Sequence, residues 1–319
     1  MSFSGMVKEE LSRHIGSGRH CKIAELAAIF TFCGSLDVGS DGNISLCIQT
    51  ENEALSRKGF TLLQKTFNIE TAVSALRMDC FRKGNLYCIS ITDQALIKEI
   101  LDSLKLEITE ISGETPFVSN SLVYQRDCCK RAFVRGAFLC SGSISDPRKG
   151  YHFEIVCPSQ RIGRQLQEIV RSFHIEAKIV LRKKSYVFYV KEGAQIVDML
   201  AIMEANVALM DLENIRILKE MRNSVNRKVN CETANINKTV NAAVKQIEDI
   251  RLLEQKVGLD SLNEGLEEIA RLRLQYPEAT LKELGLMLNP QVGKSGVNHR
   301  LRKLSVLADD LRENKEELL

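Results

Sequence analysis

The sequence predicts an α+β protein in which a duplicated α/β domain with pseudo-twofold symmetry is followed by an all-α domain. Two observations support this class. The same order of helical and alternating hydrophobic patterns occurs twice between residues 22 and 208, and the chain after about Glu213 has helical periodicity and few strand patterns. A chain of 319 residues is long enough for two or three folded units with separate cores.

The first half of the predicted duplication begins with a helix that ends at Gly34-Ser35. Its elements are helix 22–32, strand 43–50, helix 52–67, extended segments 69–77 and 85–92, and helix 94–104. The second half follows a linker that contains Ser112-Gly113 and Pro116. Its elements are helix 129–140, strand 151–157, helix 159–173, strands 175–181 and 185–190, and helix 194–205. The order helix, strand, helix, strand, strand, helix therefore occurs twice.

The ends of the two leading helices are the strongest sign of duplication. Leu26–Leu36 reads LAAIFTFCGSL and Val134–Ile144 reads VRGAFLCSGSI, an offset of 108 residues that aligns the two Gly-Ser pairs. Small side chains let two helix backbones approach closely, and these helices contain Ala27, Ala28, Gly136 and Ala137. We therefore expect the halves to meet along these helices, although small residues also suit two ordinary core helices.

Composition divides the chain into five segments. They are an N-terminal helical extension (1–21), the duplicated domain (22–208, with halves at about 22–110 and 116–208), a basic linker (209–225), a helical domain (226–308) and an acidic tail (309–319). The tail contains five acidic residues against Arg312 and Lys315, which predicts a solvated segment.

The overall composition is that of an ordinary globular protein. Lys and Arg total 44 and Asp and Glu total 41, so the net charge of +3 does not by itself indicate a nucleic-acid partner. Uncharged runs are too short for a membrane span, and Lys8, Glu9 and Glu10 interrupt the N-terminus before an apolar signal segment can form. We therefore expect a cytoplasmic protein that does not interact with membranes.

The ten cysteines lie mostly in apolar runs, where reduced thiols pack as small hydrophobic side chains. No C-x-x-C pair occurs and the five histidines are scattered, so the sequence predicts no metal site and no cofactor. The adjacent Cys128 and Cys129 leave a redox pair as the alternative interpretation.

Near the C-terminus the sequence predicts two helices joined by a tight turn. Thr280–Glu283 has the form of a capping box, which starts a short helix. Asn289-Pro290 ends this helix, Gly293 allows a turn, and Ser295 is placed to cap a second helix that reaches about residue 311. The predicted buried stripe of the second helix is Val297, Leu301, Leu304 and Ala308.

The second of these helices is basic near its start. Residues 294–303 include four Lys or Arg and no acidic residue, and this arrangement matches a helix-turn-helix module whose second helix enters the DNA major groove. Lys and Arg neutralise phosphates, whereas Asn and Arg also form paired hydrogen bonds with base edges. The predicted contacts with double-stranded DNA are Lys294, Ser295, Asn298, His299, Arg300, Arg302 and Lys303. The alternative interpretation is an amphipathic surface helix with a solvated basic face.

Taken together, these features resemble the WhiA family of bacterial regulators. The resemblance covers essentially the whole chain, and its specific parts are VNCETAN at 229–235, QIEDI at 246–250 and KSGVNHRL at 294–301. It implies a degenerate LAGLIDADG homing-endonuclease domain joined to a C-terminal helix-turn-helix domain. It also implies roles in cell division, chromosome segregation and, in sporulating filamentous bacteria, developmental transcription.

The same resemblance makes an active endonuclease a competing interpretation. In working LAGLIDADG enzymes the last acidic residue of each motif helix binds the divalent metals, and these positions are Cys33 and Ser141 in this sequence. A thiol and a hydroxyl are poor ligands for Mg²⁺, so we expect a protein that is not an enzyme. Asp37 and Asp146 lie beyond the Gly-Ser pairs and are expected on loops.

A third interpretation is a nucleoid- or division-associated protein without a transcriptional role. Basic residues at the expected strand turns either contact phosphates or are simply solvated, and they are Arg77, Arg82, Lys83, Arg182, Lys183 and Lys184. Other transcription or division proteins are candidate partners, the expected location is the nucleoid, and the oligomeric state stays open.

Overall fold

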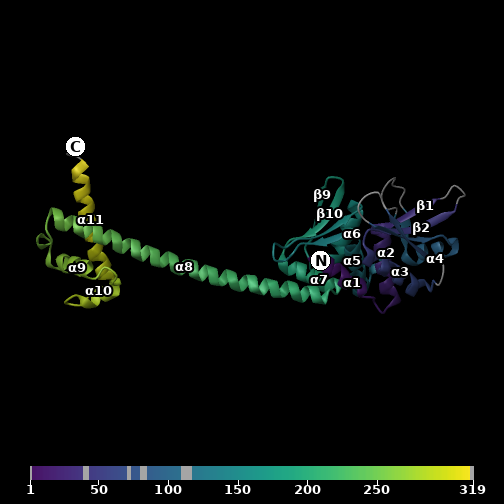
Figure 1. The fold of residues 1–319 in the computed structure, drawn as a ribbon, viewed down its shortest axis with the longest axis horizontal. Helices are drawn as coiled ribbons and strands as arrows, with labels where there is room; N and C mark the ends of the chain where they lie inside the picture. The colour runs from purple at the N-terminus through teal and green to yellow at the C-terminus, as the bar shows by residue number, and fades with distance from the viewer. Residues whose placement is uncertain (1, 39–42, 70–72, 80–84, 109–116, 317–319) are drawn as a thin grey trace. The chain divides into compact units, whose positions relative to one another are not determined.

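The computed structural model describes residues 2–38, 43–69, 73–79, 85–108 and 117–316 (Figure 1). The chain forms two compact units, residues 1–220 and 221–319. Among the described residues, no helix carries an apolar stretch long enough to span a lipid bilayer.

The first half of unit 1 is built on one four-stranded antiparallel sheet in the order β1-β2-β4-β3. Its elements are α1 (Phe3–Arg13), α2 (Arg19–Cys33), β1 (Gly34–Val38), β2 (Ile44–Thr50), α3 (Glu53–Phe67), β3 (Val73–Asp79), β4 (Asn85–Ile91) and α4 (Gln94–Leu104). Helices α3 and α4 begin close to their predicted starts, because Asn52 and Asp93 accept hydrogen bonds from the first free backbone amides.

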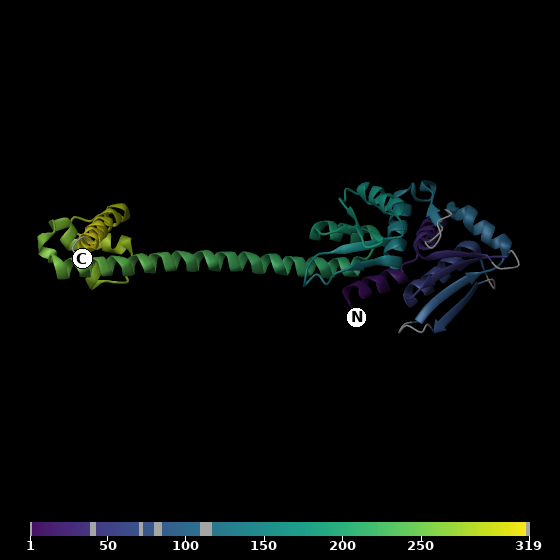
Figure 2. The same ribbon diagram turned by 90° about the horizontal axis from the view of Figure 1, so that it is seen from above.

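The second half repeats this arrangement with the sheet order β7-β8-β10-β9. Its elements are α5 (Asp127–Ser141), β7 (Gly142–Ile144), β8 (Phe153–Cys157), α6 (Gln160–Arg171), β9 (Lys178–Arg182), β10 (Ser185–Val190) and α7 (Gly193–Met203). Between the halves lie the paired strands β5 (Leu106–Ile108) and β6 (Phe117–Ser119) and a short 3-10 helix, Ser121–Tyr124. Figure 2 shows the two halves side by side in unit 1. The predicted α+β class and its duplication are confirmed.

Each half contains a strand that the sequence patterns did not predict. Gly34 and Gly142 directly follow α2 and α5 and are the first residues of β1 and β7. A Gly-Ser pair is typical of a turn, but Gly34 has extended backbone, with φ −84° and ψ 146°, and continues into a strand. Asp37 consequently pairs with Ser45 in a sheet, so its predicted loop position is wrong, whereas Asp146 lies outside the strands.

The core of unit 1 contains the contact between α2 and α5. Ala27, Ala28 and Ala137 are fully buried there. A methyl group on Gly136 would lie 2.7 Å from the carbonyl oxygen of Glu25 and 2.9 Å from Cβ of Ala28. The predicted role of the small residues is therefore confirmed, because they let the two leading helices meet.

Charged side chains are buried beside this helix contact. Lys58 Nζ lies 2.5 Å from Oε1 of Glu25 and donates a hydrogen bond of 2.6 Å to the carbonyl oxygen of Leu11. Arg135 Nε donates to the same Glu25 oxygen at 3.0 Å, and its Nη1 lies 2.6 Å from Oε2 of Glu204. Buried charges are tolerated when they are paired in this way, so these side chains join α1, α2, α3 and α5.

Helix α8 (Asn206–Lys256) contributes to the cores of both units. Ala208 and Leu212 are buried in unit 1, and Ile250 and Leu253 are buried in unit 2. The segment 209–225, predicted as a basic linker, is part of this helix. Unit 2 also contains a short 3-10 helix (Leu259–Ser261), α9 (Glu264–Gln275), α10 (Leu281–Met287) and α11 (Lys294–Glu316).

Helix α11 continues beyond its predicted end near residue 311. Arg312 Nη2 donates a hydrogen bond of 2.6 Å to Oδ1 of Asp249, whose side chain is fully buried on α8. Arg312 also pairs with Asp309 at 2.5 Å. The beginning of the predicted acidic tail is therefore helical and bonded to α8, while Asp310, Arg312 and Glu313 are exposed, in agreement with the solvated segment that its composition predicts.

Candidate nucleic-acid interface

Helices α10 and α11 and the turn between them form the predicted two-helix arrangement. The capping box of α10 is present, since the Thr280 N–H donates to Oε2 of Glu283 at 2.7 Å and the Glu283 N–H donates to Oγ1 of Thr280 at 3.3 Å. The turn returns to α10, where the Val292 N–H donates to the carbonyl oxygen of Gly285 at 2.9 Å. A methyl group on Gly285 would lie 2.0 Å from the Val292 oxygen, so this close approach requires glycine.

The inward face of α11 consists of the predicted stripe. Val297, Leu301, Leu304 and Ala308 are each at most 1% exposed, and they share one core with Leu284 of α10. This packing determines the orientation of α11 and therefore the direction of its polar side chains.

The start of α11 differs from the prediction. Ser295 lies inside the first turn, because α11 begins at Lys294 and the Val297 N–H donates to the carbonyl oxygen of Gly293. The predicted capping role of Ser295 is therefore wrong.

The opposite face of α11 carries exposed polar residues. Ser295, His299 and Arg302 are spaced by four and three positions, which places them in one row on a helix. Lys294 and Lys303 are also exposed. A row of donors flanked by cations can contact base edges and phosphates when a helix enters a groove of DNA.

Two residues of the predicted set point elsewhere. Arg300 is partly buried, and its Nη1 donates a hydrogen bond of 3.3 Å to the carbonyl oxygen of Gly265 on α9. Asn298 is also partly buried and lines a cavity of about 890 Å³ within unit 2. Lysines from α8, α10 and α11 line the same cavity, and they are Lys238, Lys282 and Lys294.

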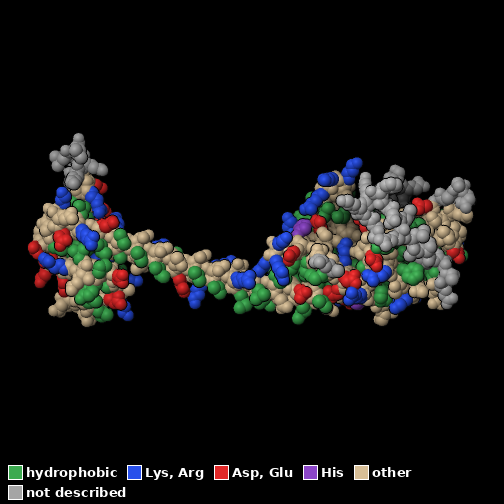
Figure 3. Space-filling model, viewed as in Figure 1, with side chains coloured by type: hydrophobic (Ala, Val, Ile, Leu, Met, Phe, Trp, Pro, Cys, Tyr) green, Lys and Arg blue, Asp and Glu red, His purple; other side chains and the backbone are tan. Residues whose placement is uncertain are grey.

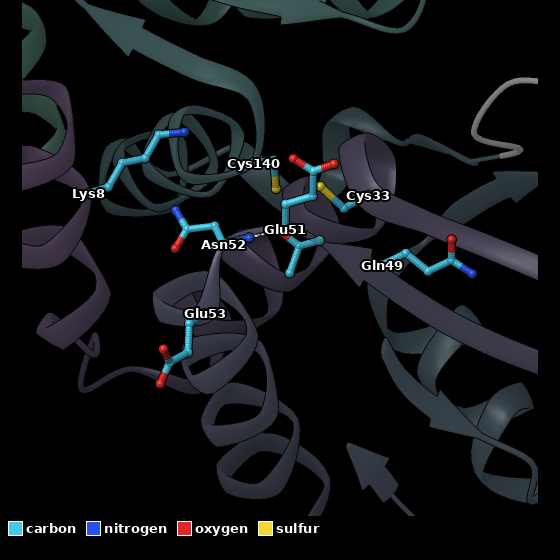
Figure 4. Close-up of a pocket in the computed structure, with 8 residues that line it drawn as sticks. Lys8, Cys33, Gln49, Glu51, Asn52, Glu53 and Cys140 are labelled. Atoms are coloured by element: carbon cyan, nitrogen blue, oxygen red, sulfur yellow. Dashed lines mark hydrogen bonds between the residues drawn. The ribbon is translucent and has the colours of Figure 1, made fainter. Parts of the chain in front are cut away.

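The predicted former catalytic position on α2 lies in unit 1, at a cavity of about 650 Å³ (Figure 4). The cavity is lined by Lys8 of α1, Cys33 at the end of α2, Gln49 and Thr50 of β2, Glu51, Asn52, Glu53 and Cys140 of α5. A hydrogen bond with Cys140 and the charge of Lys8 lower the pKa of Cys33, whereas burial raises the pKa of Cys140. Two thiols and an ammonium group therefore lie where the helix ends converge.

The other predicted catalytic position does not line this cavity. Ser141 Oγ donates a hydrogen bond of 2.7 Å to the carbonyl oxygen of Val156 on β8. Three further residues at this cavity were not predicted from the sequence: Cys140, which is one residue before the aligned position, Lys8 and Glu51. The duplication offset aligns Cys33 with Ser141 and therefore gives no signal for Cys140, and no sequence spacing connects Lys8 or Glu51 with the ends of the leading helices.

The basic hairpin of the second half is exposed. Arg182 is the last residue of β9, Lys183 and Lys184 form the turn to β10, and basic side chains project there in Figure 3. Arg182 Nη1 lies 3.3 Å from Oε2 of Glu154. In the first half, Arg82 and Lys83 fall outside the described residues, and Arg77 lies on β3. The hairpin of the second half therefore presents two lysines to solvent beside one paired arginine.

Unit 1 has the duplicated α/β architecture of the LAGLIDADG class, and unit 2 contains a helix-turn-helix arrangement. Family models match three parts of the chain: the WhiA N-terminal LAGLIDADG-like domain over residues 19–107, the WhiA LAGLIDADG-like domain over 130–222 and the WhiA C-terminal HTH domain over 225–308. The chain therefore combines two LAGLIDADG-like halves with a helix-turn-helix domain.

Similar proteins identify the family. The chain is 55% identical over 314 residues to "Probable cell division protein WhiA" of Lachnoclostridium phytofermentans, which covers 98% of this chain and 100% of the relative. A relative of the same name from Desulforamulus reducens is 47% identical over 316 residues, or 99% of this chain and 98% of that protein. The crystal structure of full-length DUF199/WhiA from Thermotoga maritima matches with a TM-score of 0.60 and 25% identity over 97% of this chain and 99% of the other. The chain belongs to the WhiA family.

Proposed function

We propose that this chain is a sequence-specific double-stranded-DNA-binding protein, a WhiA-type transcription regulator that acts in cell division and chromosome segregation. The observation that carries the proposal is the outward row of α11, Ser295, His299 and Arg302, held in place by the buried stripe on its other face. The names of the relatives support the role in cell division. The chain would then act in the cytoplasm at the nucleoid, together with other transcription or division proteins.

The predicted contact residues differ in exposure, and we propose different roles for them. Arg302 and His299 are exposed on the outward row and are suited to base edges, whereas Lys294 and Lys303 are suited to phosphates on either side. Arg300 is less suited to base recognition, because its guanidinium group is bonded to the carbonyl oxygen of Gly265. Asn298 is also less suited to base recognition, because it is partly buried and lines the cavity of unit 2.

The test is selection of binding sites by the full-length protein from a random pool of DNA duplexes, followed by affinity measurements on the selected site. We expect one preferred site. Arg302→Gln should reduce the difference in binding free energy between this site and a mismatched site by about 1–3 kcal/mol. Lys303→Gln should weaken binding to all duplexes by a similar amount. It should also reduce the magnitude of the slope of log affinity against log salt by about one. Arg251→Gln is the control, since Arg251 is an exposed arginine on α8.

The outcomes separate the competing functions. A preferred site that disappears with Arg302→Gln supports a sequence-specific regulator. If no site emerges and all duplexes bind alike, the chain is instead a nucleoid-associated protein without sequence preference. Equal effects of Arg302→Gln and Arg251→Gln would show that the outward row of α11 does not read DNA.

We also propose that the chain has no nuclease activity. Cys33 is a thiol, Ser141 is bonded to a backbone oxygen, and the ammonium group of Lys8 lines the cavity at the helix ends. The positive charge of this ammonium group disfavours the binding of a divalent cation in the same cavity by charge repulsion. Supercoiled plasmid should stay intact with the full-length protein and Mg²⁺. Nicking that Glu51→Gln abolishes would contradict this proposal.

The exposed hairpin of unit 1 gives this domain a role as a platform that orients DNA. Lys183 and Lys184 lie at its tip, and each phosphate contact releases about one counterion. The double variant Lys183→Gln/Lys184→Gln should therefore lower the salt slope by about two. An unchanged slope would favour an interaction surface for proteins instead.

A further inference from the structure

The first turns of α2 and α5 bring four potential metal ligands together. His20 and Cys21 lie in the first turn of α2, and Cys128 and Cys129 lie in the first turn of α5. The side-chain ligand atoms of all four lie within 4.8 Å of one another. This group lies at the opposite end of the two helices from Cys33, so it is separate from the former catalytic cavity.

The two pairs are related by the internal duplication. His20-Cys21 and Cys128-Cys129 are 108 residues apart, which is the offset that aligns the two Gly-Ser pairs. The local backbone is also equivalent, because the N–H groups of Cys21 and Cys129 donate to the carbonyl oxygens of Gly18 and Arg126, three residues earlier in each case. Each half therefore contributes two ligands from the same helical positions.

The distances within the group match a tetrahedral site. Nδ1 of His20 lies 3.2 Å from Sγ of Cys129, 3.3 Å from Sγ of Cys21 and 3.8 Å from Sγ of Cys128. Zinc bonds of about 2.3 Å to sulfur and 2.0 Å to nitrogen require a nitrogen–sulfur separation of about 3.5 Å in a tetrahedron. An ion at the centre of the group therefore needs only small side-chain movements.

Hydrophobic packing does not explain the whole group. Cys129 is buried and packs with Ala24 and Ala132, as expected for an inert thiol. His20 and Cys128 are exposed, yet their side chains also turn toward the same point. Three thiols and one imidazole are the donor set of Cys₃His zinc sites.

We propose that His20, Cys21, Cys128 and Cys129 form a Cys₃His site for zinc that links the two LAGLIDADG-like halves. Binding replaces three thiol protons, which pass to solvent, with one divalent cation, so the occupied site carries a net charge of −1. The ligands come from both halves, so the ion acts as a cross-link between α2 and α5. The site is solvent-accessible through His20 and Cys128, which gives the ion a path of entry.

The test uses the full-length chain, reduced and freed of metal, and then titrated with Zn²⁺ or Co²⁺. We expect one ion per chain, the visible absorption of tetrahedral cobalt with thiolate ligands, and a rise in the melting temperature of unit 1 with zinc. Cys128→Ser and His20→Gln should each lose the cobalt spectrum and the zinc-dependent rise in melting temperature. Both residues are exposed, so both variants should melt at the temperature of the metal-free parent.

Cys231→Ser is the matched control, because Cys231 is an exposed thiol on α8, outside the group. This variant should bind one ion and keep the cobalt spectrum. The proposal is overturned if the parent binds no stoichiometric ion, or if Cys128→Ser and Cys231→Ser give the same spectrum. It is also overturned if the reduced parent, re-exposed to air with equimolar zinc, forms a disulfide among these three cysteines in place of a metal complex.

Discussion

Adding one methyl group at the contact between α2 and α5 tests whether the two halves depend on close helix packing. In Gly136→Ala the new carbon would lie 2.7 Å from the backbone oxygen of Glu25 and 2.9 Å from Cβ of Ala28. The first of these atoms belongs to the backbone and the second to a side chain without rotatable bonds. The helices must therefore move apart to accept the methyl group.

The expected free-energy change combines two opposing effects. Overpacking of a tight core costs about 1–3 kcal/mol, and the upper end applies here because a backbone atom obstructs the methyl group. Replacement of Gly by Ala within a helix raises the free energy of unfolding by about 1 kcal/mol, because Ala has the higher helix propensity. Gly136→Ala should thus lower the free energy of unfolding of unit 1 by about 2 kcal/mol. For a domain of this size the melting temperature falls by about 4–8 °C.

The matched control is Gly163→Ala on α6. A methyl group there would meet the nearest atoms, on the side chain of Ile179, at 3.5 and 3.6 Å, which is ordinary van der Waals contact. Only the higher helix propensity of Ala then affects stability, so Gly163→Ala should be more stable than the parent by about 1 kcal/mol. Urea and thermal unfolding of the full-length chain, followed by circular dichroism, measure both variants. Equal stability of Gly136→Ala and Gly163→Ala would show that the contact between α2 and α5 does not require a glycine.

Three further changes test other contacts. Burial lowers the pKa of Lys58 to about 8, below its value in the unfolded chain. The unfolded state therefore binds more protons between about pH 8 and 10, and the free energy of unfolding rises with pH in that window. Lys58→Met should remove this rise between pH 7.5 and 9.5 in urea unfolding, and a rise that persists in the variant would show that Lys58 is not its source. Thr280→Ala should destabilise unit 2 by about 1 kcal/mol in the same assay through loss of the capping box, and no change would show that the box is dispensable. Arg312→Gln should destabilise unit 2, because it leaves the buried carboxylate of Asp249 without its charged donor, whereas Arg302→Gln at an exposed position should leave unfolding unchanged.

The cavity at Cys33 shows what holds the ends of the two leading helices together. The helix ends converge there, and Cys33 and Cys140 share a hydrogen bond beside Lys8. The buried pairs of Glu25 with Lys58 and Arg135 lie along the same helices. The fold of unit 1 therefore does not need a catalytic carboxylate at either helix end, because packing and these ion pairs hold α2 and α5 together.

Local sequence signals determined most of the secondary structure and the inward face of α11. Asn52 and Thr280 start their helices through hydrogen bonds within one turn, so their effect can be read from neighbouring residues. The stripe from Val297 to Ala308 follows helical periodicity and is buried as predicted. The duplicated Gly-Ser pairs and the family motifs also lie in continuous stretches. These features depend on residues close together in the chain.

Tertiary structure decided which distant residues meet. Packing of α2 on α5 brings His20 to Cys129, across more than a hundred residues, and no spacing rule for metal ligands describes two adjacent pairs so far apart. It also decided that Arg300 bonds to Gly265 while Arg302 faces outward. Periodicity tells which face of a helix is buried, but the neighbour that a long side chain reaches depends on how the helices pack. For that reason the sequence alone determined most of the elements and the family, and the packing of those elements decided which distant side chains meet.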